Sequence, residues 1–317
     1  MSANSDPVLG PHSSSLVPLP LEWVDAPPAM TPVEAEAYTK ALARSHYENF
    51  HVATFFLPKR LHQDFHNVYA YCRWSDDLAD EAGDRERSLR LLAAWERQLE
   101  ECYQGRARHP VFVALAETAR RREVPMEPFR DLLKAFVQDQ RVTRYRTYKD
   151  LLDYCRYSAN PVGRIVLQLC GHNDAERCRL SDLTCTALQL ANFWQDVIVD
   201  YAKDRVYLPL EDLERFGVTE EQIAARRFTP AFGELMRFEV ARTRDLFQGG
   251  QPLAGMVERE LASDIELFRR GGMEILNVIE EQGYNVLAAR PAISKFRKLR
   301  LLASAAFRRL TPTGAAR

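Results

Sequence analysis

The segment QLANFWQDVIVD, residues 189–200, combines a strongly apolar helix with a stripe of polar side chains. The polar side chains recur at helical spacing and are Gln189, Asn192, Asp196 and Asp200. These offsets place them on one side of a helix over three turns. The intervening residues are mostly large and apolar, so we expect this helix to be largely buried. Buried carboxylates are unfavourable unless they are paired or bound to a metal, and the stripe therefore indicates a site inside a helical protein.

A second acidic stripe lies in the segment YCRWSDDLADE, residues 71–81. Asp76 and Asp80 are four residues apart, so on a helix they differ by about 40° in direction and lie one turn apart. Tyr69 and Arg73 fall on the same stripe. Two carboxylates held this way repel each other unless a cation lies between them.

Each stripe alone has an ordinary explanation. Acidic residues near Gly83 could form a solvated helix end, and Asp196 with Asp200 could form a buried salt bridge with Arg or Lys. Two such stripes on two helices favour a different interpretation, because Mg²⁺ prefers carboxylate oxygens completed by water and substrate phosphates. We therefore predict that the stripes face one another across a helical bundle and hold Mg²⁺ and a diphosphate.

The rest of the chain also has the pattern of an all-α protein. Helical periodicity is clear in 61–82, 87–104, 127–140, 147–157, 181–203, 231–248, 256–282 and 293–309. Residues 1–30 are rich in Pro and Ser and are expected to form a disordered arm. Thr31-Pro32 then begins the first helix, with Thr31 as its N-cap. We predict one helical domain over residues 31–310 and a flexible tail over 311–317.

Composition narrows the class of protein. The chain has 317 residues, 46% of them hydrophobic, and a net charge of −1, which argues against a general nucleic-acid binder. Its six cysteines form no CxxC pair and are expected to be reduced. No apolar run is long enough to span a membrane, and no secretory signal is evident. We predict a cytoplasmic protein, with peripheral contact to the inner face of the membrane left open.

Taken together, these motifs resemble the squalene/phytoene synthases. The resemblance rests on residues 46–81, on the segment YCRYSANPVG at 154–163, and on residues 189–200 followed by DRVYLP at 204–209. It runs from about Ala43 to Arg309. It implies a single-domain isoprenoid synthase fold with a central cavity and a Mg²⁺-dependent reaction of an isoprenoid diphosphate.

The resemblance also implies roles for individual residues. Metal ligands would be Asp76, Asp80, Asn192, Asp196 and Asp200. Residues that contact the diphosphate or the rest of the substrate would be Arg73, Gln189, Arg205 and Arg290, with His46 and Tyr284 matching family active-site positions. The absence of a GxGxxG motif agrees with the expectation that no nicotinamide cofactor is used.

Two departures from the family pattern point to a particular reaction. Gln195 stands where the family usually has Arg, and Val199 stands where it usually has Glu. The runs NFWQD, ENF and SANPVG are similar to the bacterial hydroxysqualene synthases of hopanoid pathways. The implied reaction converts presqualene diphosphate and water into hydroxysqualene and diphosphate. Two alternatives are a head-to-head condensing enzyme, making presqualene diphosphate or phytoene, and a non-catalytic helical scaffold.

The C-terminal stretch from Arg290 to Arg309 contains seven basic residues and no acidic ones. Its apolar residues recur broadly at helical spacing. Such a helix could rest on an anionic membrane surface or pack on the core with a solvated basic face.

Overall fold

A computed structural model describes residues 19–45 and 58–310, with side chains as far as residue 304. The described residues form α-helices and short 3-10 turns and contain no β-strand, which confirms the predicted all-α class. The chain divides into two compact units. Unit 1 contains residues 1–141 and 165–172, and unit 2 contains residues 142–164 and 173–317.

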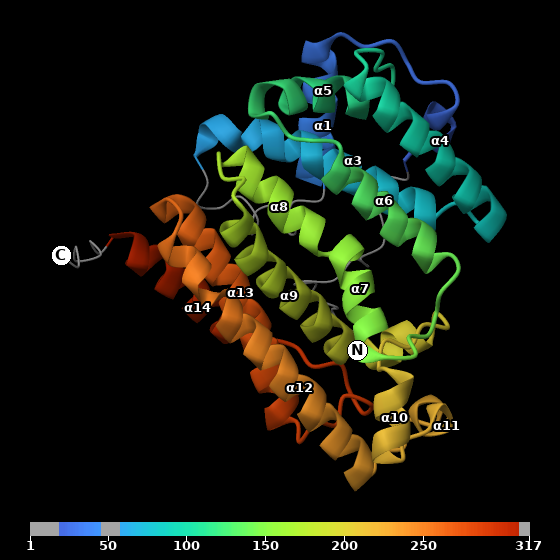
Figure 1. Cartoon of the computed structure of the whole chain (residues 1–317), viewed down its shortest axis with the longest axis vertical. Helices are drawn as coiled ribbons and strands as arrows, with labels where there is room; N and C mark the ends of the chain where they lie inside the picture. Colours follow the sequence, from blue (N-terminus) through green and yellow to red (C-terminus); the bar gives the residue numbers. More distant parts are fainter. Residues whose placement is uncertain (1–18, 46–57, 311–317) are drawn as a thin grey trace. The chain divides into compact units, whose positions relative to one another are not determined.

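Unit 1 is built around the helix that carries the first acidic stripe (Figure 1). Its helices are α1 (Pro32–Ser45), α3 (His62–Asp80), α4 (Arg85–Tyr103), α5 (Pro110–Arg122) and α6 (Glu127–Asp139), with 3-10 turns η1 (Leu21–Val24) and η2 (Lys59–Leu61). Helix α3 packs against α1, α4, α5 and α6. The buried rings of Tyr71, Trp74 and Trp95 form part of the core, and the two tryptophan rings are stacked with centroids 5.4 Å apart.

The start of unit 1 agrees with one prediction made from the sequence and differs from another. The Oγ1 of Thr31 accepts from the backbone N–H of Glu34 at 3.4 Å, and the Glu34 carboxylate accepts from the Thr31 N–H at 2.8 Å, so the predicted helix start is confirmed. The arm predicted to be disordered is structured from residue 19 onward. Trp23 stacks on Trp74 with centroids 6.4 Å apart, which explains why this part of the arm is ordered.

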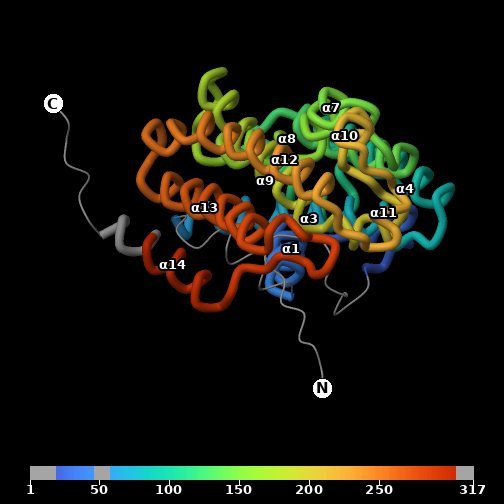
Figure 2. Tube along the Cα trace, turned by 90° about the horizontal axis from the view of Figure 1, so that it is seen from below, coloured from blue at the N-terminus to red at the C-terminus, as the bar shows by residue number. Residues whose placement is uncertain are grey.

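Unit 2 is built around the helix that carries the second acidic stripe. Its elements are α7 (Tyr148–Ser158), α9 (Ala175–Tyr201), α10 (Leu210–Phe216), α11 (Glu220–Ala224), α12 (Pro230–Gly250), the 3-10 turn η3 (Gln251–Gly255), α13 (Arg259–Glu281) and α14 (Lys295–Leu310). Helix α9 packs against α7, α11, α12 and α13. Helix α14 lies against α13, as Figure 2 also shows.

Helix α8 (Asn160–Leu169) belongs partly to each unit. One residue, Ala159, separates it from the end of α7, and this residue leaves helical geometry at φ −121° and ψ −48°. Gly163 permits close packing here, since a Cβ on it would lie 2.3 Å from Oγ of Ser181 on α9. The Oδ1 of Asn160 accepts from the hydroxyl of Thr186 on α9 at 2.9 Å. The SANPVG motif therefore separates α7 from α8 and fixes the start of α8 against α9.

The packing of α13 in unit 2 requires a residue without a side chain at position 272. A Cβ on Gly272 would lie 2.3 Å from Cζ of Phe247 on α12 and 2.9 Å from Cδ2 of Leu188 on α9. Phe247 is fully buried, so its ring has little freedom to move away.

We expect Gly272→Ala to lower the free energy of unfolding by about 1–3 kcal/mol, because the added methyl group overpacks this junction. The helical preference of Ala offsets roughly 1 kcal/mol of that loss. Gly255→Ala is the matched control, since a Cβ there meets nothing within 4 Å. Urea unfolding of the two variants would measure the difference, and equal stability would contradict the proposed overpacking.

Candidate functional site

The second acidic stripe is interrupted by a kink in α9. Asp196 lies inside this helix but has non-helical dihedral angles, φ −104° and ψ 15°. Its side chain is buried, and the neighbouring Phe193, Trp194 and Val197 are buried as well. Such sparsely populated backbone conformations often occur at functional sites. The predicted ligand Asp196 therefore coincides with the backbone irregularity of the central helix of unit 2.

The carboxylate of Asp196 is paired with Arg290. The guanidinium Nη2 donates to Oδ2 of Asp196 at 3.1 Å, and its Nε donates to Oδ1. Beside this pair, the amide Nε2 of Gln195 donates to the carbonyl of Pro291 at 2.6 Å. Gln195 and Asp196 of α9 thus bind Pro291 and Arg290, which are neighbours in the segment before α14.

Asp200 lies one turn after Asp196. Burial, and then the nearby Asp196 carboxylate, raise the pKa of Asp200 from its ordinary 3.8 to about 7, whereas the positive charge of Arg205 opposes the shift. The backbone carbonyl of Asp200 accepts from the N–H of Arg205 at 2.9 Å. The negative charge of this carboxyl group is therefore disfavoured in this structure, and a nearby cation would favour it.

The turn that carries Arg205 is fixed by contacts on both sides. Arg144 forms an ion pair with Asp204 at 2.9 Å and with Glu220 at 3.0 Å. The backbone N–H of Val206 donates to the carbonyl of Thr143 at 2.8 Å. The turn after α9 that carries Arg205 is therefore fixed in position.

The two amides of the stripe are partly buried. The Oδ1 of Asn192 is buried and has no hydrogen-bond partner within the described part of the chain. A buried carbonyl oxygen without a donor is unfavourable, and a bound cation would relieve that loss. Gln189 is half-buried one turn earlier on α9.

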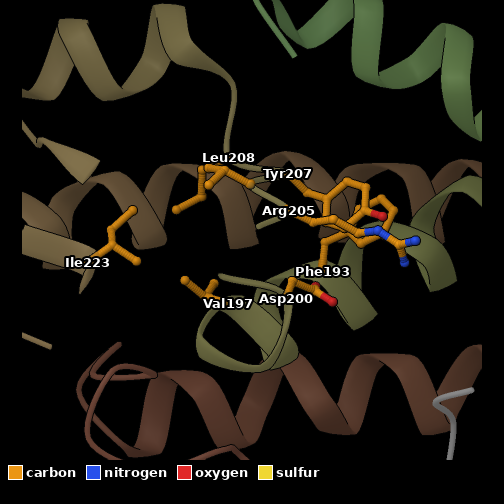
Figure 3. A pocket seen from close by; sticks show the side chains of 8 residues that line it. Phe193, Val197, Asp200, Arg205, Tyr207, Leu208 and Ile223 are labelled. Atoms are coloured by element: carbon orange, nitrogen blue, oxygen red, sulfur yellow. The ribbon is translucent and has the colours of Figure 1, made fainter. Parts of the chain in front are cut away.

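A small pocket lies where α9 meets the turn after it (Figure 3). Its cavity volume is about 10 Å³, and it is lined by Phe193, Val197, Asp200, Arg205, Val206, Tyr207, Leu208 and Ile223. The rings of Phe193 and Tyr207 are stacked with centroids 3.7 Å apart. In Figure 3 the polar ends of Asp200 and Arg205 lie toward one side, and Leu208 and Ile223 lie toward the other. A cavity of this volume holds about one water molecule, so in this structure it has no room for a large substrate.

The first acidic stripe lies at the C-terminal end of α3 in unit 1. Arg73 pairs with Asp76, with Nη1 and Oδ2 3.6 Å apart, and forms a shorter contact with Asp77. Asp76 is partly exposed, and Asp80 is exposed as the last residue of the helix. The two predicted ligands are thus accessible to solvent in this unit.

Asp77 is the residue of this segment that the sequence interpretation missed. It is 3% exposed, and burial raises its pKa to about 6 despite the opposing charge of Arg73. Its position four residues after Arg73 could have identified the pair, since such residues are neighbours on a helix. Asp77 therefore holds the Arg73 guanidinium, whose Nε is buried with no hydrogen-bond partner among the described residues.

Two predicted residues, Tyr284 and His46, remain to be considered. Tyr284 follows α13 with a left-handed φ of 64°, and the guanidinium of Arg237 lies 5.2 Å from the centre of its ring. His46 lies outside the described residues. The sequence interpretation also missed Tyr207, Leu208 and Ile223 of the pocket, because pocket-lining apolar residues have the same pattern as core residues.

The donors fit Mg²⁺ as a partial ligand set. In unit 2 they are the carboxylates of Asp196 and Asp200 and the unpartnered Oδ1 of Asn192, all hard oxygen atoms. Within residues 19–45 and 58–310, no three His, Cys, Asp or Glu side chains form a ready metal centre. Mg²⁺ commonly completes its shell with water and substrate phosphates, so a set of two carboxylates and one amide is compatible with it.

Comparison with known proteins agrees with these motifs. The sequence profile of the squalene/phytoene synthase family matches residues 43–297. The crystal structure of squalene synthase HpnC from Alicyclobacillus acidocaldarius is 47% identical, with a TM-score of 0.77, covering 80% of this chain and 96% of that one. The crystal structure of a dehydrosqualene synthase in complex with a ligand is 27% identical, with a TM-score of 0.78. The match covers 87% of this chain and 96% of that chain. Phytoene synthase 3 of Zea mays is 29% identical to this chain. The match covers 85% of this chain and 65% of the maize protein.

The raised pKa of Asp200 predicts how stability depends on pH without metal. Because the folded-state pKa lies above the unfolded value, the stabilisation is present below about pH 4 and is lost as the pH rises through about 7. Asp200→Asn stays neutral at every pH. In EDTA we expect the melting temperature of this variant to exceed that of the wild type near pH 8. Near pH 5 we expect a smaller difference between the two melting temperatures.

Thermal unfolding followed by circular dichroism would measure this gap. Asp153→Asn is the control, because Asp153 is an exposed partner of Lys149. A gap that stayed constant between the two pH values would show that Asp200 does not titrate in this range.

Proposed function

Since the chain belongs to the squalene/phytoene synthase family, we propose that it converts presqualene diphosphate and water into hydroxysqualene and diphosphate with Mg²⁺. The observation that carries this proposal is the second acidic stripe, in which the buried Asp196 pairs with Arg290 and the half-buried Asp200 lies near Arg205. The 47% identity to a bacterial squalene synthase supports the C30 series.

The residue at position 195 supports the reaction of a single diphosphate. Gln195 is buried and uncharged, and its amide is engaged with the carbonyl of Pro291. It therefore supplies no positive charge for a second diphosphate group. Val199, where the family usually has an acid, likewise supplies no further metal ligand. Both departures reduce the charge available for condensing two prenyl diphosphates.

We assign the metal-binding role to Asp76 and Asp80 of α3 and to Asn192, Asp196 and Asp200 of α9. Bound there, Mg²⁺ would neutralise charge on the diphosphate as it leaves. Arg73 of α3, Arg205 of the turn after α9 and Arg290 of the segment before α14 carry guanidinium groups, which suit phosphate oxygens. Gln189 continues the polar side of α9 toward its N-terminus.

The apolar residues of the site would protect the reactive carbon. Breaking the carbon–oxygen bond to diphosphate leaves a carbocation, which aromatic faces stabilise and which stray water would destroy. The stacked Phe193 and Tyr207 provide such faces beside Asp200. Attack by one water molecule then forms the new carbon–oxygen bond, and loss of its proton gives the alcohol.

The alternative within the family is head-to-head condensation of two prenyl diphosphates. Its support is the set of phytoene synthase relatives, such as 15-cis-phytoene synthase of Synechococcus elongatus, which is 29% identical over 84% of this chain.

Product analysis separates the two reactions. We expect mass spectrometry to detect hydroxysqualene when the protein is given presqualene diphosphate and Mg²⁺, and no product from farnesyl or geranylgeranyl diphosphate alone. Turnover of either shorter substrate alone would support the condensing activity instead.

Neutral substitutions test the metal-binding residues. Asp80→Asn, Asp196→Asn and Asp200→Asn should each lower kcat/KM by at least roughly 10²-fold, because each removes charge that offsets the cation. Asp153→Asn, remote from these residues in sequence and exposed, should retain full activity. Unchanged activity of Asp80→Asn and Asp196→Asn would rule out the metal assignment.

We also propose that α14 contacts an anionic membrane surface. None of the described helices is long and apolar enough to cross a membrane, so this contact would be peripheral. One side of α14 is attached to α13, since Arg297 pairs with Glu274 and Glu281 and Ser304 accepts from Arg270 at 3.0 Å.

The opposite side of α14 is exposed and apolar. Phe296 is 75% exposed and Leu299 is 64% exposed. Helical spacing places Ala303 with them and puts Lys295 and Arg300 at the two margins. Basic residues near an anionic surface contribute about 1 kcal/mol each, while the apolar strip can enter the headgroup region.

Vesicle flotation would test this contact. We expect the full chain to float with vesicles containing phosphatidylglycerol and not with pure phosphatidylcholine, and the double variant Phe296→Ser, Leu299→Ser to float poorly. Val33→Ser is the matched control, because Val33 is 78% exposed on α1. Equal flotation of the double variant and the wild type would remove the proposal.

A further inference from the structure

Gln195 occupies the position of a family arginine, but its contacts give it a different task. Its amide Nε2 donates to the carbonyl of Pro291 at 2.6 Å in a buried environment. Pro291 lies in an irregular segment between α13 and α14, where no helical hydrogen bond would satisfy its carbonyl. The amide of Gln195 therefore anchors this segment to α9.

The anchored segment delivers Arg290 to Asp196. Both oxygens of the Asp196 carboxylate accept from the guanidinium, one of them at 3.1 Å. A carboxylate buried to this degree needs a counter-charge, and a two-pronged contact with arginine is among the strongest that a side chain can form. Arg290 is itself 34% exposed, so it can leave without crossing the core.

We infer that Gln195 is a positioning residue that holds Arg290 on Asp196, and that Arg290 acts as an internal counter-ion competing with the metal for this carboxylate. This inference rests on the proposed function, because it takes Asp196 as a metal ligand. Metal binding would then release the guanidinium, which becomes free to contact the anionic diphosphate. The metal-free site is thereby neutralised, and arrival of the metal is coupled to exposure of a diphosphate-binding group.

An ordinary structural salt bridge would give the same contacts but different energetics. Removing Arg290 raises the negative charge near Asp196 and could tighten cation binding by charge alone. Gln195→Leu leaves every charge in place and removes only the hydrogen bond to Pro291. It therefore tests positioning separately from charge.

The experiment is a titration with Mn²⁺, which takes similar oxygen ligands, in the absence of any diphosphate. Free Mn²⁺ is measured by electron paramagnetic resonance for the wild type, Gln195→Leu, Arg290→Met and the double variant. We expect both single variants to bind Mn²⁺ more tightly, by on the order of fivefold, and the double variant to bind no more tightly than Arg290→Met.

Two controls accompany the titration. Gln168→Leu removes an amide that donates to the carbonyls of Arg122 and Glu123 at 3.1 Å, and it should leave Mn²⁺ binding unchanged. Arg244→Met removes a guanidinium that pairs with Glu280, and it should also have no effect. If Gln195→Leu does not fold, Arg290→Lys replaces it, because lysine keeps the charge without the two-pronged geometry.

The outcomes separate this inference from the proposed function. Wild-type binding that is lost in Asp200→Asn but unchanged in Gln195→Leu would overturn the inference alone. Fully additive effects in the double variant would show that Gln195 acts on Asp196 without Arg290, which also overturns it. Failure of all the proteins to bind Mn²⁺ would overturn both the inference and the metal site.

Discussion

The constraint on which this structure depends is the burial of carboxylates in the middle of apolar helices. In unit 2, Asp196 lies among buried aromatic and aliphatic residues of α9, where an isolated negative charge would be strongly unfavourable. Three parts of unit 2 meet that requirement. Arg290 comes from the segment before α14, Arg205 comes from the turn after α9, and Arg144 secures that turn. The segment before α14 and the turn after α9 thus both contribute positive charge beside the carboxylates of α9.

In unit 1 the buried carboxylate of Asp77 also has a positive partner, and this partner is close to it in the sequence. Arg73 and Asp77 lie on the same helix, one turn apart, and their contact compensates the burial of the carboxylate. Helix α3 contacts most of the other helices in unit 1, as α9 does in unit 2. Each acidic stripe therefore lies on the most surrounded helix of its unit, and a rigid scaffold of this kind is what a preorganised site requires.

The sequence predicted most of the long helices, whereas it did not predict α5 or the partners of the acidic side chains. For the helices that it indicated, periodicity placed most ends to within a few residues, because their apolar faces must meet a core. The kink at Asp196, the burial of Asp77 and the contact of Gln195 with Pro291 depend on tertiary packing, which periodicity does not contain. Likewise, residues 19–24 follow a segment rich in Pro and Ser, and their order depends on tertiary contacts such as the stacking of Trp23 on Trp74 and the burial of Val24. That the two acidic stripes face one another remains a prediction.

The path of the chain through α8 has a consequence for how such a protein can be divided. Residues 160–164 of this one continuous helix belong to unit 2 and residues 165–169 belong to unit 1. The backbone therefore passes from one unit to the other within a helix, and again after residue 172. No single cut in the gene yields either unit as an intact fragment. Exchanging one whole unit between two such proteins would therefore require a cut inside α8.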